Sequence, residues 1–356
     1  MDWTTPLKAQ QTDFIQRLKS AKLLHCDEKG QHSELTIISG QRLDQLRDFC
    51  WDMVKKYKPT DPKNYFINNM KGKLGEEVVK SRLADFVTEV DYEKRIGGDG
   101  KTDFTLTADP SIGIQVKARN GNFDKIQWSI SQEEIEKNAV LVCILIQEEV
   151  SEAQAEYNLI LAGFLPTNMI KSAAVKPLVK IDKLLYSGAL HSYLESLISS
   201  KADEYMRLGY ECLDKKYYED AIDYYTQVLQ LKPNDADAYY YRGQAYHDIG
   251  DVDGAIEDYT QSIKIDPNYA NAYFNLGLIR HTLFGDKQGA IEYYTQAIKI
   301  DPKDALAFWN RGVARSDLGQ KRRAIKDFQT AADIFEREGK EKDYQDTMQQ
   351  IREINK

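Results

Sequence analysis

The chain has 356 residues, a formal net charge of −8, 42% hydrophobic residues and 29% charged residues. This length predicts two or more domains, and the composition is that of a soluble globular protein. No apolar run approaches the roughly 20 residues that span a bilayer, and the first residues lack the apolar core of a signal peptide. The negative charge argues against a general nucleic-acid coat, and no membrane partner is expected.

Cysteine usage indicates a reducing compartment. The four cysteines, Cys26, Cys50, Cys143 and Cys212, are scattered without CxxC spacing, and the five histidines also lack metal-ligand spacing. We therefore expect neither a zinc site nor a disulfide framework. A cytoplasmic location is the simplest interpretation.

Residues 1–66 are interpreted as an extension packed on the domain that follows. Apolar spacing predicts a helix around Phe14–Leu18, a short strand over Leu35–Ile38 and a helix over Leu43–Tyr57, and Asp61-Pro62 then breaks the pattern. Basic residues outnumber acidic ones from here into the next helix. These residues are interpreted equally well as a patch that binds a phosphate backbone and as the solvated face of two helices. The basic residues are Lys55, Lys56, Lys58, Lys63, Lys71, Lys73, Lys80 and Arg82.

Residues 67–181 predict a mixed sheet flanked by helices. A helix over 67–86 precedes strands over 87–92, 103–118 (a hairpin), 128–130, 139–146 and 157–164. The run over 139–146 is continuously apolar, which is typical of a strand covered on both faces. Ser131 and Glu134 form a capping box that begins a short helix.

The hairpin concentrates polar groups that suit a metal and a phosphate. Its second strand, 112–118, alternates aliphatic residues with polar ones, so Gln115 and Lys117 share one face. Asp103 on the first strand can approach this pair across the turn at Asp109-Pro110. A carboxylate, an amide oxygen and a lysine suit a hard divalent cation beside a phosphate. The alternative is a solvated hairpin with ordinary surface charges.

These residues resemble the PD-(D/E)xK nucleases. Asp103, then Gln115-x-Lys117, preceded by the helical Gly75-Glu76, is similar to the Mrr-type branch, as is the glycine run 97–103. The resemblance covers roughly residues 67–165 and implies a restriction-endonuclease-like domain that hydrolyses phosphodiester bonds, with DNA as the favoured substrate. Thr102 stands where the family has its proline, and Gln115 lacks the charge of glutamate.

The resemblance implies a role for each site residue. Asp103 ligates Mg²⁺ (or Mn²⁺) with the Gln115 side chain or the Val116 carbonyl, and Glu76 acts directly or through water. Lys117 orients the attacking water or offsets the developing charge.

A weaker candidate, Asp99, holds the glycine loop in this interpretation. The rival interpretation is an interaction protein whose nuclease-like domain has lost catalysis and serves as a docking platform.

A linker helix over 182–200 is expected to lead into a repeat domain over 201–356. Pro233, Pro267 and Pro302 lie 34 and 35 residues apart within near-identical texts. This period resembles the tetratricopeptide repeat, a pair of packed helices. The chain contains four such units, and 341–354 resembles the helix that closes an array, so an all-α superhelix is predicted.

By the geometry of that family, the first helices of the units line a groove. An extended peptide or helix of a protein partner is the favoured occupant; the alternatives are packing against the protein's own chain and oligomerisation, a homodimer included. The residues predicted to line the groove are Met206, Tyr240, Phe274, Asn275, Trp309 and Asn310.

Overall fold

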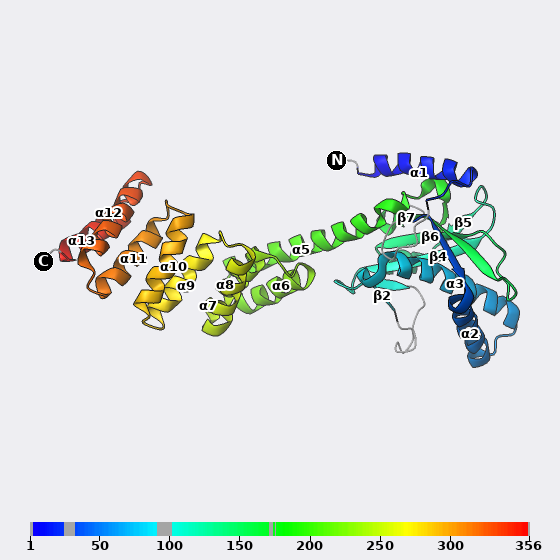
Figure 1. Cartoon of the computed structure of the whole chain (residues 1–356), viewed down its shortest axis with the longest axis horizontal. Helices are drawn as coiled ribbons and strands as arrows, with labels where there is room; N and C mark the ends of the chain where they lie inside the picture. The colour runs from blue at the N-terminus through cyan, green and yellow to red at the C-terminus, as the bar shows by residue number, and fades with distance from the viewer. Residues whose placement is uncertain (1–2, 25–32, 91–101, 171–173, 175, 355–356) are drawn as a thin grey trace. The chain divides into compact units, whose positions relative to one another are not determined.

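The computed structural model divides the chain into two units, Met1–Ile198 and Ser199–Lys356 (Figure 1). It describes residues 3–24, 33–90, 102–170, 174 and 176–354. The first unit is a mixed sheet with helices, and the second is entirely helical.

A six-stranded sheet of order β1-β7-β6-β4-β3-β2 forms the centre of the first unit. Only the β4–β6 pair is parallel among the strand pairs of this sheet in the described chain. A separate two-stranded sheet pairs β5 with β8. The strands are β1 (Leu35–Ser39), β2 (Val87–Glu89), β3 (Phe104–Leu106), β4 (Gly113–Asn120), β5 (Gln127–Ser129), β6 (Val140–Ile146), β7 (Glu156–Pro166) and β8 (Leu178–Lys180).

Helices cover both faces of the sheet (Figure 1). One core packs α2 and α3 against the face that carries Ile114, Val116 and Val142. The other core packs α1 and Trp128 against the face that carries Leu141. Every residue of β6 is buried, as its apolar run predicted. The helices are α1 (Thr4–Lys19), α2 (Gly40–Tyr57), α3 (Pro62–Leu83), α4 (Gln132–Lys137) and α5 (Leu190–Asp214), with 3-10 turns η1 (Ala84–Phe86), η2 (Thr167–Met169), η3 (Ile181–Lys183) and η4 (Ser187–Ala189).

Several boundaries differ from the sequence prediction, and two of them bear on the candidate site and the repeats. Helix α3 begins at Pro62 instead of residue 67, because Asp61 caps it by accepting from the Asn64 amide at 3.0 Å and proline suits the first helical position. Residues 182–189 contain short 3-10 turns and a β-bridge between Leu185 and Phe164 instead of an α-helix, and α5 begins at Leu190. It continues to Asp214, so the expected linker and the first repeat helix form one helix.

The second unit is a succession of helix pairs, as the repeat period predicted. A glycine in each pair makes room for an aromatic ring of the next helix: a Cβ at Gly312 would lie 2.9 Å from the Phe328 ring, and one at Gly277 would lie 2.8 Å from the Tyr294 ring. The helices are α6 (Tyr218–Leu231), α7 (Ala236–Ile249), α8 (Val252–Ile265), α9 (Ala270–Thr282), α10 (Lys287–Ile300), α11 (Ala305–Asp317), α12 (Lys321–Arg337) and α13 (Glu341–Ile354).

Partly buried arginines join neighbouring helix pairs. Arg242 of α7 holds Asp258 of α8 through two hydrogen bonds of 2.7 and 2.8 Å and reaches Thr226 of α6 at 3.0 Å. The same arrangement recurs two units later with Arg311 and Asp327. Among the described residues, no helix is both long and apolar enough to cross a membrane.

Candidate functional site

The hairpin predicted around Asp103 is formed by β3 and β4. Phe104 pairs with Ile114, and the Asp103 amide donates to the Ile114 carbonyl at 3.1 Å. Phe104 belongs to the core under α2 and α3. Because side chains alternate along a strand, Asp103 faces the other side of the sheet, which is the side of Gln115 and Lys117.

Asp103 and Gln115 form a buried polar pair. The Gln115 Nε2 donates to Asp103 Oδ2 at 2.6 Å, and the Val116 amide donates to the same oxygen at 2.7 Å. Asp103 is 8% exposed and Gln115 is 3% exposed. Asp103 is therefore not the exposed surface charge of the alternative interpretation.

The side-chain oxygen of Gln115 has no hydrogen-bond partner among the described residues. Gln115 Oε1 is buried and accepts no hydrogen bond in the described part of the chain. A buried acceptor left unsatisfied costs about 1–3 kcal/mol. An amide oxygen beside a carboxylate is the kind of donor set that Mg²⁺ or Mn²⁺ accepts.

Helix α3, which carries Glu76, packs tightly on β4 of the hairpin. A Cβ at Gly75 would lie 2.7 Å from Ala118 and 3.2 Å from Val116. Glu76 forms an ion pair with Lys73, which also pairs with Glu89 at 3.2 Å. Burial raises the pKa of Glu76 against the opposing effect of Lys73, and the negative charge of Asp103 raises it further.

This raised pKa gives a stability prediction for Glu76→Gln. The folded state favours the protonated carboxyl, so the stability it contributes is present below the ordinary pKa of 4.5 and is lost as pH rises through the higher folded pKa. Glutamine resembles the neutral form. We expect a higher Tm than wild type at pH 7 and a difference that shrinks as pH falls from the higher folded pKa towards 4.5, measured by thermal unfolding. An unchanged difference from pH 4 to pH 8 would contradict the prediction.

Lys117 is held by the short helix α4. Its Nζ contacts Glu134 Oε1 at 2.6 Å, and Glu134 also accepts from the Ser131 amide in the predicted capping box. Burial acts to raise the pKa of Glu134, but the bonds from Lys117 and Ser131 leave it below its ordinary value. The sequence indicated the cap but not that Glu134 positions Lys117.

The remaining predictions for this site concern further metal ligands, Asp99 and the basic stretch, and the described residues give them less support. Among the described residues there is no group of three His, Cys, Asp or Glu side chains that could hold a metal. Asp99 and the glycine run before residue 102 lie outside the described residues. In the basic stretch, Lys80 pairs with Glu89 at 3.1 Å and Arg82 donates to the Leu35 carbonyl at 3.0 Å.

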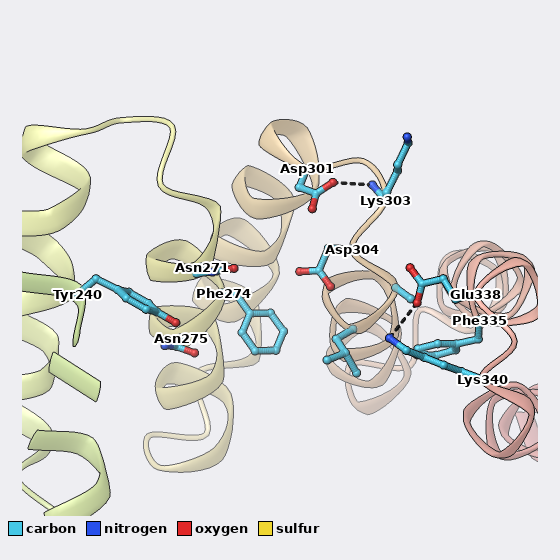
Figure 2. Close-up of a pocket in the computed structure, with 12 residues that line it drawn as sticks. Tyr240, Asn271, Phe274, Asn275, Asp301, Lys303, Asp304, Phe335, Glu338 and Lys340 are labelled. Carbon is cyan, nitrogen blue, oxygen red and sulfur yellow. Dashed lines mark hydrogen bonds and ion pairs between the residues drawn. The ribbon is translucent and has the colours of Figure 1, made fainter. Parts of the chain in front are cut away.

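The helical unit carries a pocket of about 420 Å³ (Figure 2). Residues of α7 and α9 form one wall, and the start of α11, the end of α12 and the turns before α11 and α13 form the other. Figure 2 shows the ring of Phe274 directed into the space between these walls. The lining residues are Tyr240, Asn271, Phe274, Asn275, Asp301, Lys303, Asp304, Ala305, Leu306, Phe335, Glu338 and Lys340.

Three of the six predicted groove residues, Tyr240, Phe274 and Asn275, line this pocket. Met206 and Trp309 are partly buried and pack against core clusters of the array. Asn310 donates to the Leu306 carbonyl of its own helix at 2.9 Å. The sequence missed the second wall because its residues come from the start of α11, the end of α12 and the turns before α11 and α13, outside the first-helix faces used for the prediction.

Comparison with known proteins identifies the helical unit. Residues 209–250, 243–283 and 285–319 match the family model described as TPR repeat. A crystal structure of MamA is 30% identical and covers 43% of this chain and 90% of that chain, with a TM-score of 0.37. YrrB, a TPR protein with an unusual peptide-binding site, is 23% identical and covers 41% of this chain and 75% of that chain, with a TM-score of 0.34.

The first TPR of Spaghetti, bound to an HSP90 peptide, is 22% identical and covers 34% of this chain and 95% of that chain, with a TM-score of 0.33. No curated protein sequence matches the chain. Because all three TM-scores are below 0.5, the assignment of the repeats rests on the family model.

Proposed function

Because residues 209–319 of this chain are tetratricopeptide repeats, a module suited to protein interaction, we propose that they recruit a partner for a nuclease formed by the N-terminal sheet domain. The reaction is metal-dependent hydrolysis of phosphodiester bonds, with DNA as the favoured substrate. The observation that carries the proposal is the buried Asp103–Gln115 pair with its unsatisfied amide oxygen.

The donor set fits a divalent cation. Asp103, the Oε1 of Gln115 and the carboxylate of Glu76 would hold it, with the Val116 carbonyl as a further oxygen. Asp103 already raises the pKa of Glu76, and a cation near both carboxylates would relieve their repulsion. When bound, such a cation supplies a water of lowered pKa and screens the scissile phosphate.

The remaining chemistry belongs to the protein's own side chains. Lys117 lies on the same face of the sheet as Gln115, two residues further along β4. Its ammonium would hydrogen-bond the phosphate oxygen on which negative charge develops. Glu134 holds that ammonium in place through the contact of 2.6 Å. The burial of Asp103 and Gln115 keeps their oxygens fixed before substrate arrives.

The pocket in Figure 2 supports peptide recruitment by the repeats. Phe274 and Tyr240 offer apolar area, and Asn271 and Asn275 lie one turn apart on α9, so their amides can hydrogen-bond an extended backbone. The pocket volume of about 420 Å³ suits one or two side chains of such a peptide.

A docking platform without catalysis is the second candidate. It is favoured by the neutral Gln115, which weakens metal binding compared with glutamate, and by the pairing of Lys117 with Glu134 at 2.6 Å. In this case the N-terminal domain would bind nucleic acid or protein without cleaving it.

Gln115→Glu tests the metal site directly. It adds one negative charge next to Asp103 and retains an oxygen ligand, so the metal concentration for half-maximal DNA cleavage should fall by about tenfold or more. Gln154→Glu adds the same charge on the same domain and should leave that concentration unchanged. Equal metal dependence for both variants would remove Gln115 from the metal site.

A further inference from the structure

A second polar pocket lies at the carboxyl end of β4, in the same unit as the candidate metal site. It has a volume of about 390 Å³. The end of β4, the turn after it, and the strands β5 and β8 form its walls. Its lining residues are Arg119, Asn120, Gly121, Asn122, Lys125, Ile126, Gln127 and Leu178, which include two cations and no carboxylate.

The cations of this pocket are available to a ligand. Arg119 Nη2 donates to the Ser129 hydroxyl at 3.1 Å, which fixes the direction of its guanidinium. Neither Arg119 nor Lys125 forms an ion pair with any carboxylate in the described ranges of the chain. Lys180 pairs in register with Gln127, so it stands on the same face of the small sheet as this lining residue.

The pocket continues the polar row of the candidate site. Gln115, Lys117 and Arg119 alternate along β4 and therefore share one face of the sheet. At about 3.3 Å per residue, Arg119 lies about 7 Å beyond Lys117 and about 13 Å beyond Gln115. A strand of nucleic acid whose scissile phosphate lies at Lys117 would place a neighbouring phosphate near this pocket.

We propose that the pocket binds a phosphodiester group of the nucleic-acid backbone next to the one that is cleaved. Arg119 and Lys125 hold the phosphate oxygens, and Asn120, Asn122 and Gln127 donate further hydrogen bonds to phosphate or sugar. Leu178, which is 61% exposed, gives the sugar an apolar contact. This assignment rests on the proposed nuclease function. It adds the path of the substrate strand, which follows β4 from the candidate metal site to this pocket.

Binding of nucleic acid without metal tests the pocket separately from cleavage. A fluorescein-labelled 20-nucleotide single strand and its duplex are titrated with the full chain in EDTA at several salt concentrations. Arg119→Gln combined with Lys125→Gln should weaken binding about tenfold or more and reduce the salt slope by about 2, one for each lost phosphate contact. Lys8→Gln combined with Lys19→Gln removes equal charge from exposed positions of α1. This control should change neither the affinity for nucleic acid nor the salt slope.

The possible results separate the two proposals. Equal affinity and salt slope in the pocket variant and the α1 variant, with cleavage by wild type, would overturn the pocket and leave the nuclease. Pocket-dependent binding without cleavage in any metal would support the pocket and overturn the nuclease. No binding of any nucleic acid would overturn both. Tighter binding of polyglutamate than of DNA would assign the pocket to an acidic protein and overturn the phosphodiester assignment.

Discussion

Asp103→Asn is expected to reduce metal-dependent DNA cleavage by about a thousandfold or more. The substitution removes the charge at the centre of the donor set, and metal catalysis supplies several kcal/mol at about 1.4 kcal/mol per tenfold in rate. The asparagine oxygen can still accept from Gln115 Nε2 and the Val116 amide, so the hairpin should remain folded. Single-turnover cleavage of a labelled duplex measures the loss.

Asp109→Asn is the matched control for this prediction. Asp109 is also a buried aspartate of the hairpin, 9% exposed, and its Oδ1 accepts from the Ser111 amide at 2.9 Å in the turn. It makes no contact with Gln115 or Lys117 among the described interactions. Equal losses in both variants, or a loss of folded structure by circular dichroism in Asp103→Asn alone, would assign Asp103 to stability instead of catalysis.

Lys117→Ala is expected to slow the chemical step by about a hundredfold to a thousandfold, which is the usual effect of removing one donor to a developing oxyanion. An ammonium repels a divalent cation, so the metal concentration for half-maximal cleavage should change little. The measurement is the cleavage rate as a function of metal concentration. A large shift in metal dependence with an unchanged maximal rate would contradict the assigned role.

The variant Glu134→Gln tests whether cleavage depends on the position of the Lys117 ammonium, because it leaves the lysine itself unchanged. Glu134→Gln keeps an oxygen for the Ser131 amide but weakens the contact with Lys117. We expect a smaller loss of the maximal cleavage rate than in Lys117→Ala, because the ammonium is retained and only its contact with Glu134 is weakened. Ser131→Ala removes the cap hydroxyl without removing the contact between Lys117 and Glu134, and it should leave the cleavage rate close to that of wild type.

The parts of the fold that follow from short-range patterns could be predicted from the sequence. The repeat helices, the closing helix over 341–354, the apolar strand β6 and the hairpin all depend on spacing within a few dozen residues. The start of α3 was misjudged because Asp61-Pro62 serves equally as a break and as a helix start. Only the packing of α3 shows that Asp61-Pro62 begins a helix here and does not break one.

The candidate site could be predicted only as a set of residues. The alternation on β4 placed Gln115 and Lys117 together, but the partner of Lys117 comes from α4, 17 residues away. The ion pair of Glu76 with Lys73 and the unsatisfied oxygen of Gln115 also depend on how α3 and the hairpin pack. Such contacts between distant segments leave no periodic signal in a single sequence.

Cleavage of supercoiled plasmid DNA by the purified full chain tests the central claim most directly. Wild type and Asp103→Asn are incubated side by side with Mg²⁺, with Mn²⁺ and with EDTA. The account predicts nicked or linear product from wild type with either metal, and none with EDTA or from Asp103→Asn. Equal cleavage by the two proteins, or no cleavage by wild type with either metal on DNA or RNA, would contradict it.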